Sequence, residues 1–173
     1  MDVSTIANLI NALAVTAGVI FAAAQIRHYR QRRRRDAMLE LVRSFQSPSF
    51  ASAFERVISL PDGATKAQVS ELLGVDGEVA THVVGLNWES LGVIVFRREV
   101  TLDLVDDFFS GPILLSWRKL SRYVSEQRAI LDRETAFEWF QWLAERMMER
   151  EKQTPPVPAY IAHREWKNRS GAL

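Results

Sequence analysis

The chain has 173 residues, with 22 Lys and Arg, 21 Asp and Glu, a formal net charge of +1 and no cysteine. The lack of cysteine excludes disulfides, thiolate metal sites and cysteine nucleophiles. Six basic residues and one acidic residue precede residue 36. Residues 36–173 therefore hold 16 basic and 20 acidic residues, a net charge of −4. An acidic domain is unlike a nucleic-acid-binding one, so we expect no nucleic-acid partner.

Residues 3–26 form a run of 24 residues without a formal charge. A helix of that length crosses a bilayer core of roughly 30 Å, at about 1.5 Å per residue. Each arginine beside a membrane gains about 1 kcal/mol from anionic lipid. The sequence therefore predicts a transmembrane anchor and juxtamembrane arginine cluster over residues 1–35. The cluster consists of Arg27, Arg30, Arg32, Arg33, Arg34 and Arg35.

The order of charge and apolar run indicates an orientation. A cleaved signal peptide carries its positive charge before the apolar stretch, whereas every arginine here follows it. Positive residues next to a membrane span are retained in the cytoplasm. We expect a single-pass protein of the cell inner membrane with its N-terminus outside and residues 27–173 in the cytosol. The alternative is an ordinary buried core helix.

One face of the apolar run carries small and polar residues. Small residues let helices approach closely in lipid, and an amide can hydrogen-bond across the contact. This face predicts either a homo-oligomer or a membrane-protein partner, although small residues are common in all membrane helices. Its members include Asn11, Ala14, Gly18 and Ala22.

Beyond the anchor, hydrophobic periodicity is helical nearly throughout, which predicts an all-α fold: the N-terminal transmembrane helix followed by one cytosolic bundle of about six helices. We expect a cytosolic domain over 36–153 and a Pro/aromatic tail over 154–173. Pro112 is predicted to start a helix, and Asp132 to cap the last one. The expected helices are a stalk over 36–45, then 48–60, 65–73, 76–98, 101–110, 112–131 and 132–151.

The helix predicted over 76–98 is apolar on nearly every side, which indicates burial on every side. Its segment 92–96 is β-branched and could be a strand, but no second strand offers a partner. Glu89 lies in this helix, where an unpaired carboxylate is costly. We expect a buried ion pair between Glu89 and Arg118, Arg122 or Arg128. The functional alternative is a carboxylate in a ligand pocket.

Motifs for catalysis are absent. No phosphate-binding glycine loop or nucleophile elbow occurs, and we expect no cofactor. Glu78 and His82 stand at i and i+4 and could share a metal ion, but zinc needs at least a third ligand. A core histidine is the expected reading, and we predict no metal site.

The last predicted helix carries Trp139 and Trp142 on a face of their own. Proline-rich segments favour aromatic grooves. We expect the tail, with Pro155, Pro156 and Tyr160, to fold back onto an aromatic side chain. The alternative is a mobile tail beside two half-buried tryptophans.

Residues 83–148 contain a recognisable order of motifs. They are Leu86, Asn87, Trp88, Glu89, Ser90, Leu91 and Gly92, then Asp106, Phe108 and Phe109, then Trp117 and Arg128, and then Phe140 and Leu143. In this order the segment resembles a family of bacterial proteins catalogued only as a domain of unknown function. The resemblance implies an N-terminal membrane helix and an all-helical cytosolic domain, with no activity to transfer.

Three functions remain open from the sequence. The first is a membrane-anchored, non-enzymatic interaction or scaffold protein. The second is an oligomerising membrane effector of the toxin or phage-defence type. The third is a metal-dependent hydrolase using Glu78, His82 and Glu89.

Overall fold

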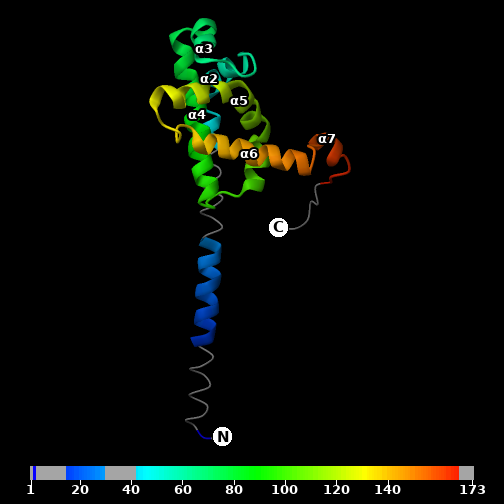
Figure 1. Cartoon of the computed structure of the whole chain (residues 1–173). Coiled ribbons are helices and arrows are strands. Elements are labelled where there is room, and N and C mark those ends of the chain that lie inside the picture. Colours follow the sequence, from blue (N-terminus) through cyan, green and yellow to red (C-terminus); the bar gives the residue numbers. More distant parts are fainter. Residues whose placement is uncertain (1, 3–14, 30–41, 168–173) are drawn as a thin grey trace.

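A computed structural model describes residues 2, 15–29 and 42–167 of the chain. Every regular element in these ranges is a helix, which confirms the all-α prediction and leaves segment 92–96 helical (Figure 1). The named helices are α2 (Pro48–Ile58), α3 (Lys66–Leu73), α4 (Val75–Phe96), α5 (Leu102–Leu131), α6 (Glu138–Gln153) and α7 (Ala159–Ala162).

Helix α4 is the centre of the domain. It packs against α2, α3, α5 and α6, and Figure 1 shows α6 crossing it. Trp88 of α4 is fully buried, stacks on Phe45 with ring centroids 4.6 Å apart, and donates its indole N–H to Ser116 of α5 at 3.0 Å. The core thus joins α4, α5 and the segment that enters α2.

Two helix starts follow from capping residues that the sequence makes visible. Ser47 accepts a hydrogen bond from the main-chain N–H of Phe50, and proline follows it at the first helical position. Thr65 and Gln68 form a reciprocal capping box at the start of α3. Side-chain oxygens satisfy main-chain donors that would otherwise lack partners, so both predicted starts are confirmed.

The predicted break at Gly111 and Pro112 is wrong, because α5 runs unbroken through both residues. Proline in a helix removes one main-chain donor and commonly ends or kinks the helix. Here burial outweighs that cost: Phe109, Ile113 and Leu120 all lie on the buried side of the one continuous helix.

The predicted cap at Asp132 is also wrong. Asp132 ends α5 in the left-handed conformation, with φ 49°, and α6 begins only at Glu138. Phe137 precedes α6, is also left-handed with φ 54°, and gives no side-chain cap. Helix α6 buries one apolar face, formed by Phe140, Leu143, Ala144 and Met147.

Helix α4 is not buried on every side, contrary to expectation. Val75, Val79, Leu86 and Phe96 are each more than half exposed. Among the described residues, α4 is the helix whose length and composition would suffice to cross a membrane, yet 44% of its most apolar window is buried in the domain. Its packing against α2, α3, α5 and α6 explains that apolar character as core.

A separate helix covers residues 15–29, and every one of its residues is exposed (blue in Figure 1). The predicted anchor residues Arg27, Gly18 and Ala22 lie in it. A Cβ added at Gly18 would meet nothing within 4 Å. The other predicted residues of this region, Asn11, Ala14, Arg30 and Arg32–Arg35, lie outside the described residues.

Candidate functional site: the seat of helix α6

The start of α6 rests on α4 beside the carboxylate of Glu89. The Oε2 atom of Glu89 accepts a hydrogen bond from the main-chain N–H of Phe140 at 2.8 Å. Because Phe137 offers no side-chain cap, Glu89 supplies from another helix the acceptor that the N-terminus of α6 lacks. A negative charge is also favoured at this end of a helix by the helix dipole.

Two glycines of α4 make room for this contact. A Cβ on Gly92 would lie 2.5 Å from the carbonyl oxygen of Trp139, and one on Gly85 would lie 2.6 Å from the Phe137 ring. Gly85, Glu89 and Gly92 stand at i, i+4 and i+7, so they share one face of α4. We call this face, with Glu89 between the two glycines, the α6 seat.

Arg128 of α5 holds the same segment from the other side. Its Nε donates to the carbonyl of Ala136 at 2.9 Å, and its guanidinium also donates to the carbonyl of Phe137 at 3.4 Å. A third bond, at 2.6 Å, reaches Oε1 of Gln141 in α6. Planar guanidinium groups suit such multiple recognition. The turn before α6 is thus clamped between Glu89 and Arg128.

The environment of Glu89 disfavours its charge. Burial raises the pKa of the Glu89 carboxyl above its usual value, and the negative charge of Glu138 adds to this. Hydrogen bonds from the main-chain N–H groups of Phe140 and Trp139 lower the same pKa, and the charge of Arg128 lowers it a little further. Glu89 is therefore held chiefly by main-chain donors.

The predicted ion pair of Glu89 is not formed. No arginine of the described residues lies within 4.0 Å of its carboxylate: Arg118 pairs with Asp62 at 3.3 Å, and Arg122 with Glu126 at 3.4 Å. All three arginines lie on α5, which packs against α4, but Arg128 donates its hydrogen bonds to the turn before α6 and to Gln141. Asn87 is half-buried and donates to the carbonyl of Val83 at 2.7 Å, within its own helix.

The residues of the hydrolase hypothesis do not converge. His82 is exposed, contrary to the core-histidine expectation, and its Nδ1 lies 2.7 Å from the carbonyl oxygen of Glu78. Glu89 faces α6. Over the described ranges of the chain, no three His, Asp or Glu side chains gather closely enough to hold a metal ion.

A second polar feature, absent from the sequence predictions, joins α5 and the end of α6. Arg150 pairs with Asp103 at 2.7 Å and with Asp106 at 2.9 Å, and the hydrogen bond to Asp106 raises the pKa of the guanidinium. A cavity of about 650 Å³ borders Arg150 and the start of the tail. Tail residues 154–167 are all exposed, and no aromatic ring among them pairs with the ring of Trp139 or Trp142. The sequence carries no local sign of this pair, because Arg150 and Asp106 are 44 residues apart.

Comparison with known proteins places the chain in a family. No match was found among curated proteins or among solved structures. A family model matches residues 12–147, which include residues 12–26 of the apolar run, the arginine cluster, the α6 seat and most of α6. The match covers well over half of the chain, and the protein belongs to the family described as Domain of unknown function (DUF4760).

Proposed function

We propose that this chain is a single-pass protein of a cell inner membrane, with its N-terminus outside and its helical domain in the cytosol. Its role there is to present the domain as a non-enzymatic interaction or scaffold module. The lipid partner is a bilayer containing anionic lipid, which the arginine cluster at Arg27–Arg35 contacts.

The observation that carries the proposal is the exposure of helix 15–29. Val19, Ile20 and Phe21 are each 64–67% exposed, although they are large and apolar. Water disfavours contiguous apolar surface of this kind, whereas a bilayer solvates it and the helix satisfies its own backbone. The uncharged run over residues 3–26 extends this surface in the sequence.

The α6 seat supports the non-enzymatic part of the proposal. The carboxylate of Glu89 accepts main-chain hydrogen bonds, and the guanidinium of Arg128 is engaged by Ala136, Phe137 and Gln141. A catalytic acid or base must reach a substrate proton. Here both side chains form hydrogen bonds that hold α6 in place, as expected for structural residues of a rigid module.

Alkaline carbonate extraction of membranes containing the full chain tests the anchor. The wild type should stay in the membrane pellet, and Ile20→Arg/Phe21→Arg should release it, because both charges fall inside the apolar run. An arginine costs at most about 2.5–3.5 kcal/mol, the value at the centre of a span. The matched control is Tyr160→Arg/Ile161→Arg, two exposed apolar residues of α7, which should remain in the pellet. Wild type found in the supernatant would refute the anchor.

Membrane potential during induced expression separates the scaffold from the effector. A scaffold leaves the potential unchanged. Loss of potential with the wild type, absent with Ile20→Arg/Phe21→Arg, would replace the scaffold by an effector that acts on the bilayer.

A further inference from the structure

We infer that the turn between α4 and α5 is a second lipid contact, which rests the domain on the anionic surface of the same bilayer. The inference rests on the proposed membrane anchor and adds a surface to it. Its elements are an aromatic cluster, Phe96 with Trp139 and Trp142, and the two arginines that follow Phe96. We call these five residues the turn patch.

Three aromatic rings meet at the end of α4. The Phe96 ring lies 4.7 Å from that of Trp139 and 6.1 Å from that of Trp142, measured between centroids, and the two indoles are 6.0 Å apart. Phe96 is 58% exposed and both tryptophans are half-buried. Aromatic residues with one face buried and one edge wet are typical of membrane interfaces.

Arg97 and Arg98 add positive charge beside these rings. Both are exposed, and neither forms an ion pair with any residue that the structure describes. Glu99 follows the two arginines and is also exposed. The segment that enters the domain carries one further exposed arginine, Arg43. Unpaired arginines complement the negative potential of an anionic leaflet.

The backbone at Arg98 is left-handed. Arg98 has φ +60°, and its N–H donates to the carbonyl of Val95 at 2.9 Å, just after α4 ends. Glycine is the usual residue at such a left-handed position because it has no Cβ. Arginine at this position carries a cost in backbone strain that glycine would avoid.

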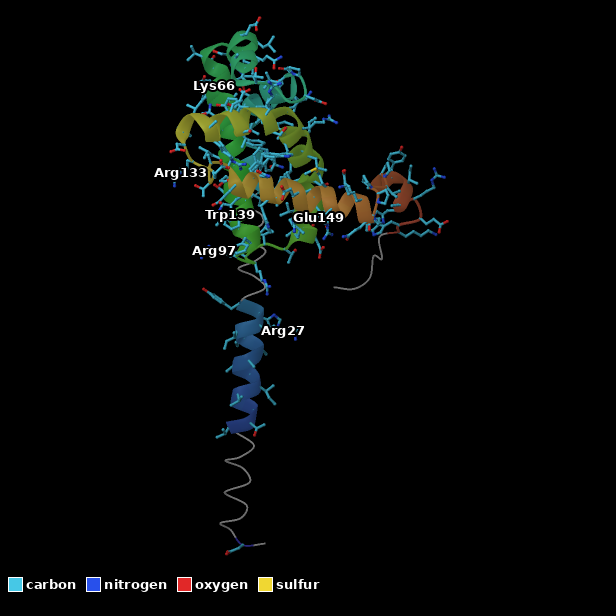
Figure 2. The ribbon with its side chains drawn as sticks, in the orientation of Figure 1. Arg27, Lys66, Arg97, Arg133, Trp139 and Glu149 are labelled. Atoms are coloured by element: carbon cyan, nitrogen blue, oxygen red, sulfur yellow. The ribbon has the colours of Figure 1, made fainter. Side chains whose placement is uncertain are left out.

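The position of the turn patch favours lipid over another partner. Figure 2 shows Arg97 at the end of the domain nearest helix 15–29, whose Arg27 lies at the facing end. The same figure places Lys66 at the opposite end of the domain, so the patch is on the side toward the bilayer. The juxtamembrane arginines and the turn patch would therefore contact one anionic surface.

Full-length protein reconstituted in phosphatidylcholine vesicles with brominated acyl chains, with and without phosphatidylglycerol, tests the inference. Tryptophan emission should be quenched more strongly when phosphatidylglycerol is present. Trp139→Phe/Trp142→Phe should remove that extra quenching, which assigns it to the patch. Arg97→Glu/Arg98→Glu should abolish it as well.

The matched control is Arg133→Glu/Lys152→Glu, the same charge change at two exposed residues away from the turn patch. It should be quenched like the wild type. Arg97→Ser/Arg98→Gly is the second variant, because glycine relieves the left-handed φ at residue 98 and guards against misfolding. It should lose the extra quenching while its melting temperature holds or rises.

Vesicle flotation separates the two possible failures. A chain that floats but shows equal quenching with and without phosphatidylglycerol overturns the lipid contact and leaves the anchor intact. A chain that does not float overturns the anchor and the turn-patch inference together.

Discussion

Glu89 of α4 and Phe140 of α6 are 51 residues apart, yet the carboxylate of the first accepts the main-chain N–H of the second at 2.8 Å. The bond substitutes for the missing local cap at Phe137. It fixes α6 to the central helix, and α6 carries both tryptophans of the turn patch. The position of these two tryptophans thus depends on the α6 seat.

Replacement of Glu89 by alanine should destabilise the full chain by about 1–2 kcal/mol, the usual cost of losing a helix cap. Glu89→Gln keeps an oxygen acceptor for Phe140 and should cost much less. Denaturant unfolding in detergent micelles measures both. Equal losses for the two variants would mean that the charge, and not the acceptor, is what α6 needs.

The raised pKa of Glu89 gives this residue a predicted pH dependence. The folded state binds the proton more tightly than the unfolded state, so its stabilising contribution is complete below the ordinary carboxyl pKa and is lost as pH rises through the folded pKa. The difference in stability between wild type and Glu89→Gln should therefore widen in favour of Gln as pH rises from acid toward neutral. A difference that stays constant with pH would contradict the assignment.

Gly92→Ala should destabilise the protein by about 1–3 kcal/mol, because the added methyl meets the backbone of Trp139 at 2.5 Å and the helices must separate. The matched control is Gly111→Ala in α5, where a Cβ meets nothing within 4 Å. There the gain in helix propensity opposes the restriction imposed by Pro112, so stability should stay within about 1 kcal/mol of wild type. Thermal melts of both variants measure the two effects. An unchanged melting temperature for Gly92→Ala would refute close packing at the α6 seat.

Arg128→Met should cost about 1–3 kcal/mol, since the carbonyls of Ala136 and Phe137 lose a charged donor while the apolar stem is retained. Arg122→Met is the control, because its side chain is 66% exposed and its pair with Glu126 is a surface one worth little. Comparison of the unfolding free energies of the two variants tests whether Arg128 holds the turn before α6. Similar losses at the two positions would show that Arg128 holds nothing specific.

How far the sequence could predict the fold depends on how local the signal is. Ser47 and Thr65 predict helix starts correctly because an N-cap side chain bonds to a main-chain N–H only three residues away. The predictions based on Pro112 and Asp132 are wrong. Tertiary burial keeps α5 continuous through Pro112, and residues in the left-handed conformation form the turn before α6. Glu89 could be recognised as a carboxylate needing a partner. Its actual partner, a main-chain N–H of α6, carries no side-chain signature, although Gly85 and Gly92 on the same helical face are a visible sign of close packing.

A pair of C-terminal reporter fusions to the full chain in a bacterial host tests the central claim most directly. Green fluorescent protein folds in the cytosol, and alkaline phosphatase is active only outside it. With Arg27–Arg35 retained beside the span, we predict fluorescence in the membrane fraction and no phosphatase activity. Phosphatase activity, or fluorescence confined to the soluble fraction, would contradict a cytosolic domain held on the membrane by this N-terminal helix.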